Sequence, residues 1–410
     1  MAKKKLTYAS IVPLIGGENL GIHQALDGQL PEYVLSYTPF QHNDKHYISY
    51  LRNQKKWKGD YVFLDENPDY HAKHVNAVNA VCPCAGLSSL SHQSSSDSAI
   101  NKWMYESAEY VLKNIKPDVF WGENAPRLST EKGRPVADKL YQIGRENGYS
   151  MTLYYTESRL HGLSQKRPRT FYFLMKGDKA PILNRFFREP EPIEAILEQP
   201  PIPNDPMDVL INVDDPMDCG FLRYCMAKEG TKTLRQFYNK IEESTVVVRS
   251  AIDEYSKRNV DEVICWMTEN KVDDKYIRRA KGIKAKLAQD LGYWAHGNTV
   301  LKGVIPAFVS MIPFCSINAK KGRFLTVREA LRIMKMPDDF VLANENPLAD
   351  VNHICQNVPV TTAADMAAEV NRMIRGEIEL ADSTFIRQSN KNGEIKYLEE
   401  APKATLDSFL

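Results

Sequence analysis

The chain has 410 residues, of which 43% are apolar and 26% are charged. This composition is ordinary for a globular protein, and the length exceeds what one compact core usually supports, so we expect two lobes. Lysine and arginine total 53 against 52 acidic residues, a net charge of +1. Any nucleic-acid binding must therefore come from local basic patches. No stretch approaches the roughly 20 apolar residues that span a membrane, and no secretory signal is predicted.

The cysteine pattern argues against disulfides. Seven cysteines are scattered along the chain at irregular spacing. An odd count without a framework is typical of a reducing compartment, so we predict a cytoplasmic protein, most simply a monomer. Cys82 and Cys84 lack the two-residue gap of zinc motifs and have no finger-like partners, so no metal site is predicted.

Strand and helix patterns alternate through the first part of the chain. Helices are predicted from about 17 to 26, over 99–115 and over 133–147, and strands over 6–13, 33–37, 60–64, 75–82, 117–122, 151–155 and 170–175. This alternation predicts an α/β fold: a mostly parallel, doubly wound sheet with helices on both faces.

The composition and the sequence pattern change after Asp178. Residues 189–208 are rich in proline and acid, 231–290 are charged and mostly helical, and alternation returns near Phe324. We therefore expect a larger lobe of residues 1–180 plus 321–380, a smaller lobe of 181–320, and a polar tail of 381–410.

Five segments in order carry a recognisable combination of chemistry. They are PCAGLS (83–88), GEN (122–124), QKRPR (165–169), LTVREA with its PDD end (325–339), and the closing NVP (357–359). The series resembles the DNA cytosine-5 methyltransferase family over 1–175 and 322–370. The resemblance implies a class I methyltransferase, Rossmann-like fold, with target recognition in the smaller lobe.

The chemistry explains the residue types in these segments. Carbon 5 of cytosine becomes nucleophilic only after a thiolate adds to C6, and by resemblance that nucleophile is Cys84. Glu123 would stabilise the charge that develops at N3. Arg167 and Arg169 alternate on one strand, so both would face the base, holding O2 and a phosphate. The plain alternatives are a buried cysteine pair, a solvated acid and a solvated strand edge.

The donor-binding half departs from the family. By resemblance Ile15, Gly16, Gly17, Pro83 and Asn357 would surround S-adenosyl-L-methionine, and Asp60 would contact its adenine amine. However, Val12 and Leu14 stand where an aromatic residue and a glycine are usual, and Thr38 falls where an acid should bind the ribose. Ala85 and Gln356 are further departures. A divergent enzyme, a modified one-carbon donor and loss of catalysis all remain open.

Contacts to double-stranded DNA are predicted for Ser88 and Gln165, and for Arg278, Arg279 and Lys281 in the basic run 275–289. Such a run is as often a solvated helix face. The function we predict is methyl transfer to C5 of a flipped-out cytosine through a transient Cys84–C6 bond. Alternatives are an RNA cytosine-5 methyltransferase, a transferase with an altered donor, and a silent DNA-binding homologue. A Rossmann dehydrogenase fits the glycine pattern poorly.

Overall fold

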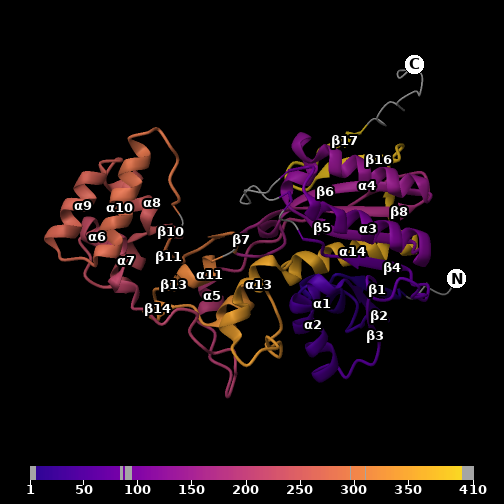
Figure 1. Ribbon diagram of the computed structural model, residues 1–410, viewed down its shortest axis with the longest axis horizontal. Coiled ribbons are helices and arrows are strands. Elements are labelled where there is room, and N and C mark those ends of the chain that lie inside the picture. Colours follow the sequence, from indigo (N-terminus) through magenta and orange to yellow (C-terminus); the bar gives the residue numbers. More distant parts are fainter. Residues whose placement is uncertain (1–5, 84–85, 88–94, 296, 310, 399–410) are drawn as a thin grey trace.

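The computed structural model describes residues 6–83, 86–87, 95–295, 297–309 and 311–398. Its centre is a nine-stranded sheet in the order β17-β16-β6-β8-β5-β4-β1-β2-β3 (Figure 1). The strands are β1 (Tyr8–Ile11), β2 (Tyr33–Ser36), β3 (Asp60–Phe63), β4 (Ala77–Ala80), β5 (Val119–Asn124), β6 (Tyr149–Glu157), β8 (Pro168–Lys176), β16 (Phe385–Ser389) and β17 (Ile395–Tyr397). All seven strands predicted from the sequence are present.

The sheet is mostly parallel, as predicted. Strands β3, β2, β1, β4 and β5 run parallel to one another, whereas β8 lies antiparallel between β5 and β6. The chain between β6 and β8 holds only a short 3₁₀ turn and the two-residue β7 (Gln165–Lys166). A connection this short cannot carry a crossover helix, so β8 must reverse direction.

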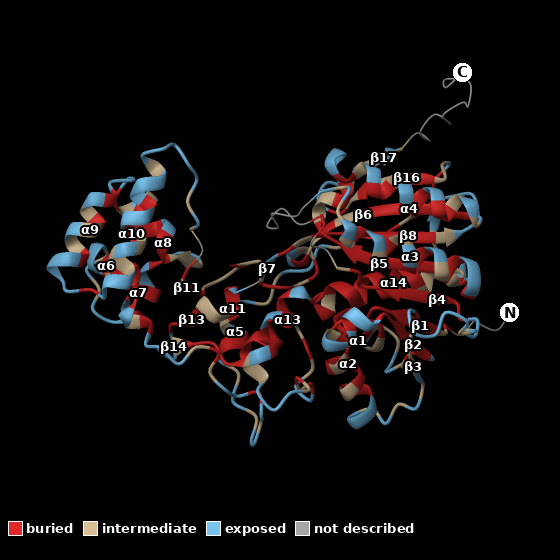
Figure 2. Ribbon diagram, viewed as in Figure 1, coloured by how far each residue is buried: buried red, intermediate tan, exposed pale blue. Residues whose placement is uncertain are grey.

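Helices cover both faces of the sheet. Trp121 of β5 faces Ala367 and Val370 of α14 (Val360–Arg375), which packs against α1 (Gly17–Ala25). Asn124 lies three residues further along β5, and its amide contacts Met104 of α3 (Lys102–Tyr110). Because side chains alternate along a strand, α3 and α14 lie on opposite faces. Helix α4 (Arg134–Glu146) packs beside α3. The strands between these layers are buried (Figure 2).

The second lobe has a core of its own, set apart from the large sheet (Figure 1). Its buried apolar residues run from Cys219 to Phe324. It consists of α6 (Gly220–Lys228), α7 (Leu234–Lys240), α8 (Val247–Arg249), α9 (Val260–Glu269), α10 (Asp274–Leu287) and a sheet of β10 (Thr245–Val246), β11 (Thr299–Val300), β13 (Ser316–Asn318) and β14 (Arg323–Phe324).

The segment from 193 to 211 behaves differently from the rest of the predicted smaller lobe. Ile193, Met207 and Ile211 share a core with Ile15 and Leu20 of the large lobe. The independent core thus begins about 40 residues later than the boundary expected at 181, because the proline-rich segment buries its few apolar side chains on the larger lobe.

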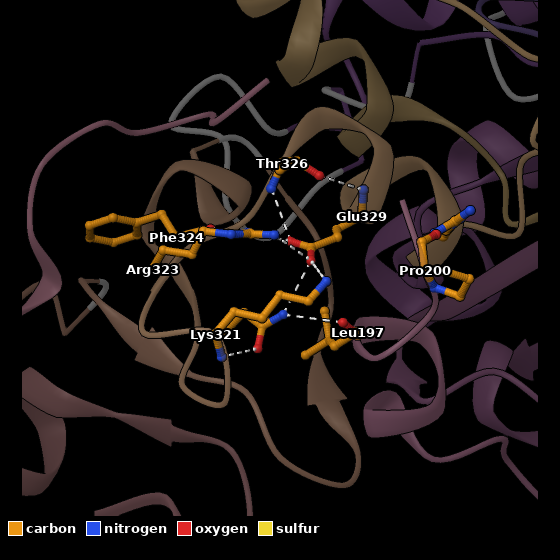
Figure 3. A network of polar contacts seen from close by, with 9 residues as sticks. Leu197, Pro200, Lys321, Arg323, Phe324, Thr326 and Glu329 are labelled. Atoms are coloured by element: carbon orange, nitrogen blue, oxygen red, sulfur yellow. Dashed lines mark hydrogen bonds and ion pairs between the residues drawn. The ribbon is translucent and has the colours of Figure 1, made fainter. Parts of the chain in front are cut away.

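Glu329 joins the two lobes. Helix α12 (Val327–Ile333) begins after Thr326, whose hydroxyl and the Glu329 carboxylate form a reciprocal capping box, which confirms the predicted capped helix. The same carboxylate accepts hydrogen bonds from Lys321, Arg323 and Asn318 near β13 and β14 (Figure 3). The start of α12 is therefore tied to the small sheet of the second lobe.

The expected C-terminal tail contributes to the sheet. Phe385–Ser389 forms β16, which pairs parallel with β6, and β17 adds to it antiparallel. The Phe385 ring stacks on Tyr141 of α4 with ring centroids 4.5 Å apart. These strands are short and polar, so the sequence pattern did not distinguish them from a tail. Among the described residues, none of the helices has both the length and the apolar character to cross a bilayer.

Candidate active site

An acid and a guanidinium meet at the end of β5. Glu123 lies opposite Phe171 of β8, and Arg169 precedes Phe171 by two residues. The two side chains are therefore diagonal neighbours on one face. They form an ion pair between Arg169 Nε and Glu123 Oε1, with only 10% and 4% of the side chains exposed. The structure thus brings together two of the predicted catalytic residues.

Arg167 lies in a different environment from Arg169. It is fully buried, and its guanidinium donates to the carbonyls of Phe308, Cys355 (2.8 Å) and Asn357 (2.9 Å). The expected strand alternation fails because Arg167 falls in the break between β7 and β8, where its N–H turns back to Gln165 O. The prediction that Arg167 faces the base is therefore wrong. Its guanidinium instead connects the segment between β7 and β8 to the backbone at Phe308 and at 355–357.

Gln165 is likewise an internal residue. Its side chain accepts from the N–H of Phe308 (3.0 Å), and its strand β7 pairs with β12 (Ile305–Pro306). Gln165 is fully buried. This burial contradicts the predicted contact with DNA.

The Pro-Cys loop leaves the sheet beside Glu123. Strand β4 pairs with β5 at Ala80 and Gly122, so Pro83 follows at the same carboxyl edge. Cys84 and Ser88 lie outside the described residues. Cys82 is buried in the core with its Sγ 3.6 Å from Trp103 O, and burial raises the pKa of its thiol to about 12. Cys82 therefore packs, as predicted, and is unsuited to act as a thiolate.

The loop after β1 is held by side chains from two other elements. Leu14 N donates to Asp44 Oδ1 (3.0 Å), and Gly17 N donates to Asn357 Oδ1 (2.8 Å). A Cβ on Gly17 would lie 2.1 Å from Val358 O, so only glycine fits against this segment. Gly17 and Asn357 thus come together as the resemblance implied.

The backbone of this loop is unusual for its residues. Val12 and Leu14 have φ of 53° and 52°, and Gly16 has φ of 89°. A β-branched residue with positive φ is a genuine outlier that packing must hold in place. Ile15 is fully buried in the core shared with Tyr47, which also packs on Gly16. Ile15 therefore contributes through its backbone or through packing.

The predicted role of Asp60 does not fit its position. Asp60 opens β3 opposite Tyr33, at the amino edge of the parallel strands. Ligands of such sheets bind at the carboxyl edge. Asp65 follows β3 at that edge, where its carboxylate accepts from Thr38 N (2.9 Å), and Glu66 accepts from the Thr38 hydroxyl. Two carboxylates, those of Asp65 and Glu66, thus lie beside position 38, where the acid expected from the family is missing.

Two observations fit an adenosyl donor at this edge. The carboxylates of Asp65 and Glu66 are suited to ribose hydroxyls. The rings of Tyr37, Phe40 and Trp103 cluster beside them, with Tyr37 and Trp103 centroids 4.7 Å apart. These rings form an aromatic cluster next to Thr38, whereas the position expected to carry an aromatic residue is Val12. The signal in the sequence was the DE pair just after a predicted strand.

Glu18 is a buried acid that the sequence reasoning missed. It lies in the first turn of α1, accepts from Asn79 Nδ2 (3.0 Å), and has no partner for Oε1 among the described residues. Burial, with the neighbouring charge of Glu123 as a smaller cause, raises its pKa well above the ordinary value. Burial therefore favours the protonated form of Glu18, which lies near Glu123.

The basic run lies on α10 of the second lobe. Arg278 and Lys281 are exposed, whereas Arg279 is half-buried, with its guanidinium 5.7 Å from the Phe221 ring centroid and close to Gly297. Only the first two extend into solvent freely enough to meet a phosphate.

The sheet has the order described above with one reversed strand, and a glycine loop and an acid lie at its carboxyl edge. These features define a Rossmann-like class I methyltransferase. A family model described as C-5 cytosine-specific DNA methylase matches residues 7–372. The chain belongs to this family and is an enzyme that methylates C5 of cytosine in DNA.

Two solved structures share the fold. A putative DNA modification methyltransferase encoded within an Escherichia coli prophage has 14% identity and a TM-score of 0.54, covering 90% of this chain and 99% of that one. The Entamoeba histolytica methyltransferase EhMeth has 12% identity and a TM-score of 0.50, covering 90% and 98%. A comparison with curated proteins found no match.

Proposed function

We propose that Cys84, Glu123 and Arg169 form the catalytic set that acts on a flipped-out cytosine in double-stranded DNA. The observation that carries this proposal is the buried Glu123–Arg169 pair at the edge where β4 leads into the Pro-Cys loop. A carboxyl group and a guanidinium side by side match the N3 and O2 edge of cytosine. The target atoms lie inside a duplex stack, so the base has to leave it.

The proposed reaction begins at the thiolate of Cys84, which forms a bond to C6. The ring electron pair shifts toward N3, where Glu123 donates a proton, and Arg169 donates to O2. C5 would then form a bond to the methyl group as the sulfur–methyl bond of the donor breaks, leaving a neutral thioether. A base removes the C5 proton, the C6–S bond breaks, the thiolate is released, and N3 returns its proton to Glu123. Burial raises the pKa of Glu18, which favours its uncharged form beside Glu123.

S-Adenosyl-L-methionine is the donor we propose, and when bound it supplies an electrophilic methyl group. Asp65 and Glu66 would hold its ribose, and Gly16, Gly17 and Asn357 would shape the surface beside its methionine part. The contacts of Gly17 and of Thr38 described above support this assignment. Pro83 would restrict the backbone directly before Cys84.

DNA contacts are proposed for Arg278 and Lys281, whereas Arg279 lies against Gly297. Phosphate contacts of this kind provide most of the affinity and make it salt-dependent.

The experiment that tests the catalytic set is covalent trapping on duplex DNA containing 5-fluorocytosine, whose fluorine cannot leave as a proton does. The protein with S-adenosylmethionine should form a denaturation-resistant adduct, Cys84→Ala should form none, and the matched control Cys82→Ala should still form it. An adduct that survives Cys84→Ala, or is lost only in Cys82→Ala, would refute the assignment. The same assay on transfer RNA tests the alternative that the enzyme acts on RNA. Mass spectrometry of the nucleosides identifies the group transferred.

A further inference from the structure

Four side chains capable of binding metal gather away from the catalytic edge. His42 and His46 lie on α2 (Gln41–Asn53), and Asp350 and His353 lie at the start of α13 (Val351–Gln356). His42 Nε2 is 3.2 Å from Asp350 Oδ1, and His353 Nδ1 is 3.6 Å from the same oxygen. His46 Nε2 is 3.2 Å from His353 Nδ1.

The carboxylate of Asp350 is divided between two environments. Its side chain is fully buried. Oδ2 accepts from Asn344 Nδ2 (2.7 Å) and lies 3.2 Å from Lys45 Nζ. Oδ1 accepts no hydrogen bond from any described residue, although the two imidazole nitrogens face it. A buried carboxylate oxygen without a hydrogen bond is costly, and it points into the space between the two rings.

We propose that His42, Asp350 and His353 bind a divalent first-row transition metal ion, zinc being the natural probe. Two imidazoles and one carboxylate are a common zinc donor set, with bonds of about 2.0–2.2 Å. Tetrahedral geometry with such bonds places neighbouring ligand atoms about 3.3–3.6 Å apart. The two separations from Asp350 Oδ1, 3.2 and 3.6 Å, lie near the two ends of that range. His42 is 61% exposed, which leaves a fourth position open to water.

His46 acts in this site as a supporting residue. Its Nδ1 accepts from Ala343 N–H (3.0 Å), so its ring proton is on Nε2. That nitrogen therefore cannot coordinate the ion. Its N–H donates to His353 Nδ1 (3.2 Å), and an ion bound at that nitrogen would release it toward Asp350 Oδ2, which lies 3.7 Å away. Together with Lys45 it would orient the ligating carboxylate from behind.

The location gives the ion a structural effect. Helix α2 carries Asp44, whose carboxylate accepts from Leu14 N, and Asn357, whose side chain accepts from Gly17 N, directly follows α13. An ion between the two helices would clamp both anchors of the loop after β1. The effect on the donor loop rests on the proposed function; the metal site itself does not.

The test uses the full chain, stripped of metal by chelation. We expect calorimetry to find one tight site for zinc, and zinc to raise the melting temperature by several degrees. Cobalt in place of zinc should give the visible absorption bands of a tetrahedral site. The His42→Ala variant changes an exposed side chain and should weaken zinc binding at least tenfold, whereas the control His71→Ala, also exposed, should not.

Three results would overturn the site: no zinc binding by the intact chain, unchanged binding in His42→Ala and His353→Ala, or binding lost in Cys84→Ala instead. The first would leave only a hydrogen-bonded ion-pair cluster, and the third would place the ion at the Pro-Cys loop. Because zinc binding is measured without DNA or donor, failure here leaves the trapping experiment unaffected.

Discussion

The edge proposed to bind the base and the loop proposed to face the donor agree with the family pattern to different degrees. At the base edge, Glu123 and Arg169 match the family by residue type, and the pairing of β5 with β8 makes them diagonal neighbours that form an ion pair. In the donor loop, Val12 and Leu14 replace the usual residues, yet the loop is held through Asp44 and Asn357. A pyrimidine edge demands particular chemical groups, whereas a backbone shape can be enforced by many different packing partners.

The largest effect should come from breaking the base edge. Glu123→Gln and Arg169→Ala should each lower kcat by about 10²–10⁴-fold, because each removes charge stabilisation that develops only in the transition state. The double variant should lose less than the product of the single losses, since the two side chains act as a pair. Single-turnover methylation of duplex DNA measures this, and fully multiplicative losses would show that the pair does not act together.

Substitutions of the two arginines in the QKRPR segment should differ in their effect on the free energy of unfolding. Arg167→Ala should destabilise the fold by about 3–5 kcal/mol, because three buried carbonyls lose a charged donor. Arg169→Lys serves as the matched control: it keeps a positive charge beside the buried Glu123 carboxylate, so it should cost the fold much less while lowering turnover. Urea unfolding followed by circular dichroism makes the comparison. Equal destabilisation by both substitutions would contradict the different roles.

The donor loop should respond more mildly. Asn357→Ala removes the acceptor of Gly17 N, and a lost buried hydrogen bond costs about 1–2 kcal/mol. We therefore expect S-adenosylmethionine to bind about 5–30-fold more weakly, as measured by calorimetry, with kcat at saturating donor little changed. A variant that binds the donor normally would show that this anchor is dispensable.

The smallest effect should come from the second lobe. Replacing both Arg278 and Lys281 with alanine should reduce the slope of log affinity against log salt by about 2, with no change in the preferred site. The matched control is Lys271→Ala on the turn before α10, an exposed lysine outside the proposed contact. Fluorescence anisotropy with duplex DNA at several salt concentrations measures the slope, and an unchanged slope would remove α10 from the interface.

Much of the fold followed from local patterns. The apolar runs of the first 175 residues predicted all seven strands, and Thr326 with Glu329 predicted the start of α12. The strands β16 and β17 were missed because they are short and polar, and their stability comes from pairing with β6 and from the Phe385–Tyr141 stack. No local pattern carries such a long-range contact.

The site divides in the same way. Residue types and their order determined the family, the reaction and the pair Glu123 and Arg169, because the chemistry of a cytosine ring admits few substitutes. Only the tertiary structure decided that Arg167 and Gln165 point inward, that Asp65 and not Asp60 lies at the carboxyl edge, and that His42 meets Asp350 and His353. Those facts depend on strand breaks, strand direction and helix contacts, where residues hundreds of positions apart become neighbours and spacing along the chain carries no information.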